Sequence, residues 1–312
     1  MNAENAFHIP VLATTVCELL ITNPGGIYVD GTLGGGGHAE AVLNRLDKSG
    51  VLIGIDQDQD AIDFASKRLA PFQKQVRIVK QNFGEISEIL NTLNIKTVDG
   101  FFLDLGVSSF QLDESRRGFS YLSSVKLDMR MSSENSLTAI DILNAYDEED
   151  LANLFYRYGE ERLSRKIARR IVRRRKQNPI IFSDELRQIV SSAVPYKQQI
   201  KSLSRVFQAL RIEVNQELVN LEKFLAQIIP YLKPKGRIVI IAYHSLEDRI
   251  VKHFFKQKSG HCICPPHLPQ CICNAKRQLN IITRKVIKPG AEEIRANPRA
   301  SSARLRAAEK IV

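Results

Sequence analysis

The sequence predicts an α/β fold in which a mostly parallel sheet is interrupted by an inserted domain of helices. Over the first third of the chain, short runs rich in β-branched and aromatic residues alternate with helical stretches, as in βαβ units. This alternation stops near residue 111, and strand-like runs resume only after residue 205. With 312 residues, the chain can bury the cores of two domains. We expect an α/β domain in two parts, residues 1–110 and 206–312, and an all-helical domain at residues 111–205.

Each expected element follows from its own residue pattern. The strand-like runs before the interruption are Ile27–Asp30, Val51–Asp56, Val76–Val79 and Gly100–Asp104. Between the first two runs, apolar residues at 39, 42, 43 and 46 share one helix face. Helical patterns in the interruption cover residues 140–158, 161–176 and 183–193. Apolar residues three and four positions apart then predict one long helix from Phe207 to Ile228, followed by a strand from Arg237 to Tyr243.

The net charge of +11 is concentrated in residues 251–312, which hold 13 basic and 3 acidic side chains. A local basic excess indicates a polyanionic partner, either nucleic acid or an anionic membrane surface. The longest apolar run, Ile238–Tyr243, is too short to span a bilayer, and the first residues lack the pattern of a signal peptide. We therefore expect a cytoplasmic protein that does not cross a membrane.

A glycine-rich turn, Asp30–His38, separates the first expected strand from the first helix of the sheet. Glycine lets a ligand approach the backbone closely, although tight turns also need glycine for structural reasons alone. Asp56 ends the second strand, where a carboxylate can accept hydrogen bonds from ribose hydroxyls. Asp104 ends the fourth strand at the same edge. The pattern predicts a site for a nucleoside cofactor at this edge.

Two cofactors fit such a site, a nicotinamide dinucleotide and S-adenosylmethionine. The dinucleotide fingerprint G-x-G-x-x-G is not matched by the spacing of Gly31, Gly34 and Gly36. The acidic Asp30 before the turn also suits a cation better than a pyrophosphate. S-adenosylmethionine carries a sulfonium and an ammonium group and no phosphate, so we expect it rather than the dinucleotide.

Several longer motifs, each different from the others, are distributed along almost the whole chain. They are Asp30–Gly34 with Gly36–His38, Asp104–Ser109 with Gln111–Asp113, Arg117–Ser120, Leu127–Met131, Tyr158–Glu161, Phe207–Ile212, His244–Arg249 and Asn297–Arg299. Together they resemble the bacterial ribosomal RNA small-subunit methyltransferase H family. One departure is Tyr243, because the family's motif would have phenylalanine before His-Ser-Leu-Glu-Asp-Arg.

The resemblance implies the Rossmann-like class I S-adenosylmethionine-dependent methyltransferase fold with an inserted helical domain. It implies methylation of the exocyclic N4 of a decoding-centre cytosine in 16S rRNA of the small ribosomal subunit. The alternative is a non-catalytic rRNA-binding assembly factor that keeps the fold. By matching motif positions, the implied cofactor-binding residues are Gly36, Gly37, His38, Asp56, Phe83, Asp104 and Gln111.

Three residues are candidates for the chemistry on the base. Amino-methyltransferases often use an Asn/Asp-Pro-Pro-aromatic motif, and here Asp104-Leu105-Gly106 stands in its place. Asp104 is therefore a candidate acceptor for hydrogen bonds from the amino group, unless the cofactor occupies it. Tyr243 and His244 end a strand at the same edge and could stack on or orient the cytosine. A helix cap or a bond to the core is an equally good explanation of His244.

Two further patterns indicate binding outside this edge. Nine basic residues between 162 and 176 surround an apolar stripe; a solvated face is the usual explanation, but the resemblance favours contact with rRNA phosphates.

Four cysteines form two C-x-C pairs, and four thiolates can bind zinc, although this spacing is tighter than the usual C-x₂₋₄-C. These hypothetical zinc ligands are Cys262, Cys264, Cys271 and Cys273.

Overall fold

The computed structural model describes residues 10–107, 117–121, 123–261 and 276–311. The chain divides into two compact units, which we call the α/β unit (residues 1–106 and 218–312) and the helical unit (residues 107–217). The second boundary differs from the expected one at residue 205, which lies inside helix α10 (Gln199–Asn215). All of α10 belongs to the helical unit because its apolar face, including Phe207 and Leu210, packs in that unit's core.

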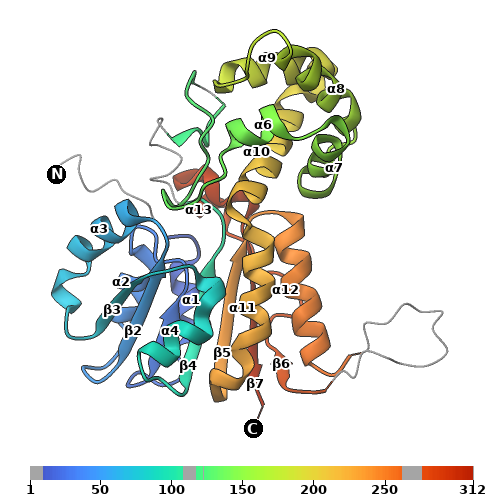
Figure 1. Cartoon of the computed structure of the whole chain (residues 1–312). Coiled ribbons are helices and arrows are strands. Elements are labelled where there is room, and N and C mark those ends of the chain that lie inside the picture. The colour runs from blue at the N-terminus through green and yellow to red at the C-terminus, as the bar shows by residue number, and fades with distance from the viewer. Residues whose placement is uncertain (1–9, 108–116, 122, 262–275, 312) are drawn as a thin grey trace. The chain divides into compact units, whose positions relative to one another are not determined.

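The α/β unit contains a seven-stranded sheet in the order β3-β2-β1-β4-β5-β7-β6 (Figure 1). The strands are β1 (Ile27–Asp30), β2 (Val51–Asp56), β3 (Val76–Lys80), β4 (Val98–Asp104), β5 (Leu232–Ala242), β6 (Leu279–Ile281) and β7 (Arg304–Lys310). Strands β1 to β5 are parallel, and β7 pairs antiparallel with both β5 and β6. The class I methyltransferase fold class is confirmed, with two strands, β6 and β7, that the sequence patterns did not predict.

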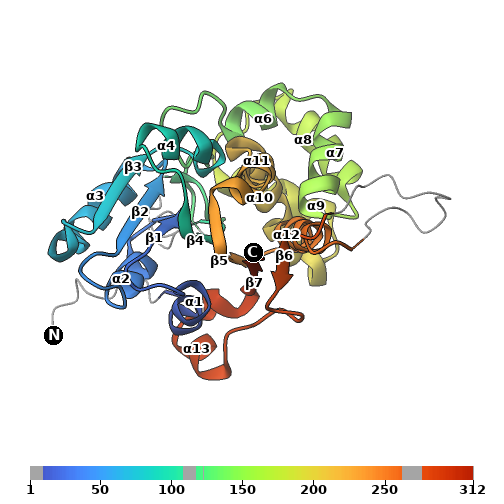
Figure 2. The same ribbon diagram turned by 90° about the horizontal axis from the view of Figure 1, so that it is seen from below.

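Helices cover both faces of the sheet because consecutive strand residues point to opposite sides. Val29 and Phe101 pack with α4 (Ile86–Thr92) and α11 (Glu217–Tyr231). Tyr28 and Phe102 pack with α1 (Ala13–Leu20) and α2 (Gly37–Leu43) on the other face. Figure 2 shows these two pairs of helices on opposite sides of the strands. The helices of the α/β unit are α1 (Ala13–Leu20), α2 (Gly37–Leu43), α3 (Gln59–Arg68), α4 (Ile86–Thr92), α11 (Glu217–Tyr231), α12 (Ser245–Lys258) and α13 (Ala291–Ala296).

The single long helix expected from Phe207 to Ile228 is instead two helices, α10 and α11. Gln216 adopts a left-handed conformation (φ 50°), which ends an α-helix. The Arg211 guanidinium spans the break with two hydrogen bonds of 2.8 Å to the Glu217 carboxylate. The apolar spacing continues through this break, so periodicity alone could not locate it. Strand β5 also begins earlier than expected, at Leu232.

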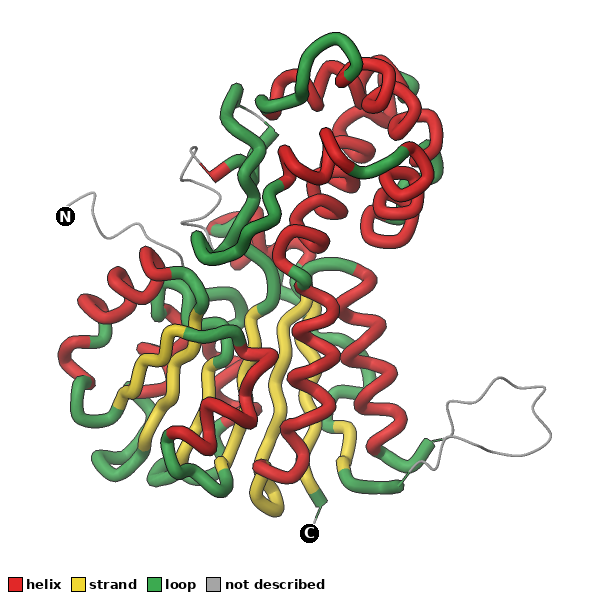
Figure 3. Tube along the Cα trace, viewed as in Figure 1, coloured by secondary structure: helices red, strands yellow, loops and turns green. Residues whose placement is uncertain are grey.

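The helical unit consists of short helices packed around one apolar core (Figure 3). The expected helix at residues 140–158 is two helices, because Asp147 accepts a hydrogen bond from Asp150 N (2.7 Å) and starts a new one. The helices are α6 (Ala139–Ala145), α7 (Glu148–Gly159), α8 (Ser164–Arg175), α9 (Ser183–Ala193) and α10. No helix among the described residues is both long and apolar enough to cross a membrane.

Close packing of α7 against α10 gives a stability prediction. A Cβ atom added at Gly159 would lie 2.6 Å from the backbone oxygen of Arg205. We therefore expect Gly159→Ala to destabilise the helical unit by about 1–3 kcal/mol, because a helix must move to relieve the clash. Thermal unfolding checks this, with Gly290→Ala as the matched control, since nothing lies within 4 Å of a Cβ there. Equal melting temperatures for both variants would contradict the prediction.

Candidate active site

The glycine turn (residues 31–37) crosses the carboxyl ends of three neighbouring strands. Gly31 N donates to Phe102 O of β4 (3.0 Å), and Leu33 N donates to Ile55 O of β2 (2.9 Å). At Gly31 an added Cβ would lie 2.5 Å from the Leu103 side chain and 3.2 Å from Phe83 Cβ. Glycine is therefore required there by close approach, and the turn is fixed to the edge at which open parallel sheets bind ligands.

Asp56, the last residue of β2, anchors this turn. Its Oδ2 accepts a hydrogen bond from Gly34 N (2.8 Å), and its Oδ1 accepts one from Asp58 N (2.9 Å). Burial raises the pKa of Asp56 to about 6, even though these backbone hydrogen bonds lower it. An ionised carboxylate has about four acceptor positions, and the backbone of Gln57 also donates to Asp56, so the carboxylate retains capacity for a further donor such as a ribose hydroxyl.

Asp30 is the least compensated carboxyl group at this edge. Its side chain is 2% exposed, Oδ1 accepts from Thr32 N (3.1 Å), and Oδ2 has no hydrogen-bond partner among the described residues. Burial, together with the charges of Asp104 and Asp56, raises the pKa of Asp30 to about 7. Leaving a buried acceptor unsatisfied costs free energy, and a bound cation would remove that cost. The site thus fits a positively charged ligand.

Asp104 lies at the end of β4 between an aromatic donor and a histidine. Its Oδ1 accepts a hydrogen bond from Tyr243 Oη (2.9 Å), while Oδ2 lies 3.5 Å from His38 Nδ1. Burial and the negative charge of Asp104 raise the pKa of Tyr243, so the hydroxyl stays protonated and donates. The backbone N of Asp104 also donates to Thr32 Oγ1 (2.6 Å), which joins β4 to the glycine turn.

His38 is held in one orientation at the start of α2. Its Nε2 lies 2.8 Å from Val11 O, and burial lowers the pKa of His38 to about 4. The ring is therefore neutral near pH 7, and Nε2 carries the proton because a carbonyl oxygen can only accept. It follows that the Nδ1 lone pair lies on the side of Asp104 Oδ2, at a distance of 3.5 Å.

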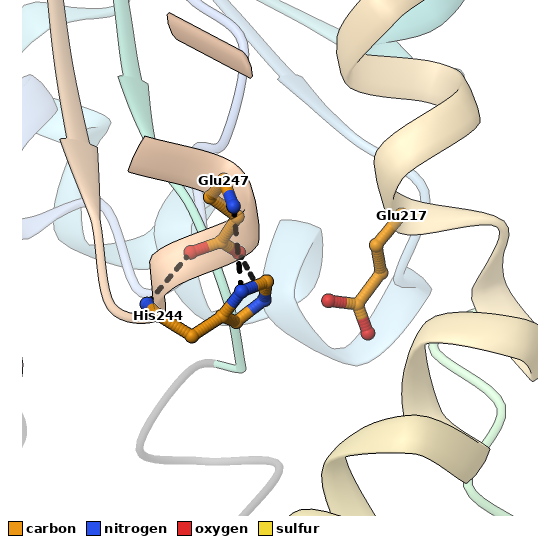
Figure 4. Close-up of side chains that lie close together, drawn as sticks. All are labelled: Glu217, His244 and Glu247. Atoms are coloured by element: carbon orange, nitrogen blue, oxygen red, sulfur yellow. Dashed lines mark hydrogen bonds and ion pairs between the residues drawn. The ribbon is translucent and has the colours of Figure 1, made fainter. Parts of the chain in front are cut away.

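His244 caps helix α12 (Figure 4). Its Nδ1 accepts a hydrogen bond from Glu247 N (3.4 Å), and Glu247 Oε2 accepts from Tyr243 N (2.8 Å) and His244 N (3.2 Å). His244 Nε2 lies 3.1 Å from Glu247 Oε1 without forming a hydrogen bond. These contacts give His244 the capping role that the sequence left open, and they hold the backbone of Tyr243 in place.

The structure brings Gly36, Gly37, His38, Asp56, Asp104 and Tyr243 to the carboxyl edge of the sheet. Phe83 reaches the same edge beside Gly31, with its ring packed edge-on against Phe224 at 5.7 Å between centroids. Gln111 and the four cysteines at 262, 264, 271 and 273 lie outside the described residues. Asp30, Thr32 and Glu247 were absent from the expected site residues; only Asp30 had a signal, its position just before the glycine turn.

Comparison with known proteins decides the family. Residues 5–311 match the family model of the MraW methylase family. The chain belongs to this family. A member from Carboxydothermus hydrogenoformans, named Ribosomal RNA small subunit methyltransferase H, is 49% identical over 97% of this chain and 98% of its own length. A Finegoldia magna protein of the same name is 45% identical over 98% of this chain and 99% of its own.

Solved structures similar to this MraW-family methylase are more distant. An rRNA methylase from Streptococcus thermophilus has a TM-score of 0.43 and 11% identity, and the match covers 96% of this chain and 94% of that one. An SAM-dependent O-methyltransferase from Thermotoga maritima has a TM-score of 0.42 and 11% identity, with 96% and 64% covered.

Proposed function

We propose that this methylase transfers a methyl group from S-adenosylmethionine to the exocyclic N4 of a decoding-centre cytosine in 16S rRNA of the small ribosomal subunit. The observation that carries the proposal is the unsatisfied, buried Asp30 Oδ2 within a ring of strand-end carboxylates, in a chain of the MraW methylase family. The names of its relatives support small-subunit rRNA as the substrate. A ribosomal substrate also supports action in the cytoplasm.

The cofactor fits the charges of the carboxyl edge. When bound, S-adenosylmethionine supplies an electrophilic methyl group, and its two cationic groups suit an edge that holds Asp30, Asp56 and Asp104. Asp56 would hold the ribose, since its carboxylate retains acceptor capacity beside its backbone donors. His38 and residues 36 and 37 would hold the amino-acid portion, and Phe83 would lie against the adenine.

Asp104 is the proposed contact to the amino group of cytosine. The N4 lone pair is delocalised into the ring, so an acceptor for an amino hydrogen is needed to turn that lone pair towards the methyl carbon. Tyr243 fixes Asp104 Oδ1 by its hydrogen bond, which leaves the carboxylate pre-positioned. The proton that N4 loses can be held between Asp104 Oδ2 and His38 Nδ1, because those two atoms already lie 3.5 Å apart. Tyr243 would orient the base.

The test is methyl transfer from labelled S-adenosylmethionine to purified small subunits and, separately, to naked 16S rRNA. The rRNA is then digested to nucleosides and separated by chromatography. We expect the label in N4-methylcytidine. Label on a ring carbon, on a ribose oxygen or on protein would refute the proposal for N4.

Cofactor binding gives a second prediction. Asp56→Ala should weaken the binding of S-adenosylmethionine by about 100-fold. Two hydrogen bonds from the ribose to a charged acceptor contribute roughly 1.5–3 kcal/mol each, and hydrogen bonds to water recover part of this loss. Calorimetry measures the affinity. Asp63→Ala is the matched control, because Asp63 is an exposed carboxylate on the following helix α3. No binding by the wild type would favour the non-catalytic assembly factor; unchanged binding by Asp56→Ala would exclude its ribose role.

A further inference from the structure

The exposed face of α8 in the helical unit carries a row of cations. We call it the basic stripe: Arg165, Lys166, Arg169, Arg170 and Arg173. Their spacing of one, three, one and three residues places them on one side of the helix. The opposite side, with Ile167, Ala168 and Ile171, is buried in the core of the helical unit. The stripe is therefore held by a packed scaffold with its charges in solvent.

Most of the stripe has no partner in the described part of the chain. Arg165, Lys166, Arg170 and Arg173 make no ion pair or side-chain hydrogen bond with another described residue, and the pair of Arg169 with Glu148 (3.3 Å) is exposed. The neighbouring arginines on this helix behave differently. Arg174 bonds to Glu185 (3.0 Å), and Arg175 donates to Leu143 O (2.7 Å). Helix α8 thus carries two kinds of arginine: those bonded within the fold and those whose guanidinium groups can bind another molecule.

The stability of the fold gives no reason for Arg165, Lys166 and Arg170, whereas Arg173 lies in the last turn, where a cation suits the helix dipole. Cations in the first turn of a helix, as at Arg165 and Lys166, oppose the positive end of the helix dipole. Like charges three or four residues apart, such as Arg165 with Arg169 and Lys166 with Arg170, repel each other. A feature that costs stability and is left unpaired in the structure points to a binding role.

The side chains of the stripe suit a phosphate backbone as the binding partner. Four of its five members are arginines, whose planar guanidinium groups bind phosphate oxygens in pairs. The stripe is about 12 Å long, at about 1.5 Å per residue, and repeats a cation at each turn, which suits a row of phosphates. A membrane-surface helix would need apolar side chains beside the cations, but those of α8 are buried.

We propose that the basic stripe docks the phosphate backbone of RNA, on a different unit from the carboxyl edge that performs the chemistry. This rests on the proposed function for the identity of the RNA. The stripe would bind phosphates irrespective of sequence, so its contribution is to affinity and to salt dependence rather than to the choice of cytosine.

The test compares two triple variants that remove the same charge. One is Lys166→Gln/Arg170→Gln/Arg173→Gln in the stripe, and the other is Lys67→Gln/Lys74→Gln/Lys96→Gln at exposed lysines of the α/β unit. Binding to a 16S rRNA transcript is measured at a series of KCl concentrations. For three lost phosphate contacts, we expect the slope of log K against log[KCl] to fall by about 2–3 and the affinity at about 0.1 M to fall by about 100-fold. The lysine control should retain the wild-type slope.

Three further measurements keep the result interpretable. The stripe variant should be at least as heat-stable as the wild type, because its like charges repel one another, and its S-adenosylmethionine affinity should be unchanged. Identical salt slopes for the two variants would overturn the proposal. The proposal would also be overturned if the stripe variant lost binding to phosphatidylserine vesicles but kept the wild-type affinity for RNA. Failure of the wild type to methylate small subunits, with the stripe's effect on RNA binding intact, would refute the proposed activity and leave the docking surface standing.

Discussion

Replacing Asp104 with asparagine is expected to lower N4 methylation by about 10²–10⁴-fold, the range for losing a positioned proton acceptor. Asparagine keeps an oxygen for the Tyr243 hydroxyl and turns an amide NH₂ towards His38 Nδ1, so the local packing survives. The negative charge and the acceptor facing His38 are lost. Single-turnover methylation of small subunits at saturating S-adenosylmethionine measures the effect on the chemistry.

A matched control lies on the same strand at the opposite edge of the sheet. Asp99 accepts hydrogen bonds from Ile27 N and Lys233 Nζ, both at 2.8 Å, and has a structural role. Asp99→Asn should lower the melting temperature without changing the rate of methyl transfer. Asp104→Asn should do the reverse. Wild-type turnover by Asp104→Asn would remove Asp104 from the proposed chemistry.

Replacing Asp30 with asparagine is expected to stabilise the cofactor-free protein at alkaline pH. Burial, with Asp104 and Asp56 nearby, raises the pKa of Asp30 from 3.8 to about 7, so the folded state holds a proton that the unfolded state releases. Below about pH 4 both states are protonated and the group has no effect. Between about pH 4 and 7 stability is progressively lost, and above that the cost is as much as about 4 kcal/mol.

Urea unfolding of the wild type and Asp30→Asn at about pH 4 and pH 8 measures this cost. We expect equal free energies of unfolding at the lower pH and a more stable variant at the higher one. The variant should also bind S-adenosylmethionine more weakly, since the negative charge opposite the cation is gone. A substitution that stabilises the fold at a binding site commonly lowers binding or activity in this way. A pH-independent difference between the two proteins would show that Asp30 is not the strained group.

The sequence predicted strands β1 to β4 and the glycine turn at their carboxyl edge well, because strand ends and glycine turns are local features. Strands β1 to β4 are β-branched or aromatic runs, and the carboxyl groups that end β1, β2 and β4 meet at one edge because these parallel strands lie side by side. Strand β7 has no strand-like pattern, because Arg304–Lys310 holds four charged residues and no β-branched or aromatic one; its antiparallel partners place it. The break at Gln216 was hidden by apolar spacing that continues through it.

Other features depend on three-dimensional surroundings that no local pattern encodes. His244 follows a strand and precedes a helix, where a helix cap leaves no mark in the sequence; the contacts with Glu247 show the cap. The unsatisfied oxygen of Asp30 depends on burial beneath the glycine turn and on Thr32 using only Oδ1. The basic stripe was visible in composition, but its separation from Arg174 and Arg175 required their partners.

The strand order has a consequence for how the chain is built during synthesis. Among the described residues, the hydrogen bonds that fix the glycine turn join residues within the first 106, so all of these partners are synthesised early. Strand β5, which carries Tyr243 at its end, pairs with β4 only after the helical unit has been made. Strand β7 then enters between β5 and β6 as the last strand. The residues proposed to bind the cofactor are therefore all synthesised before Tyr243, the residue proposed to orient the base.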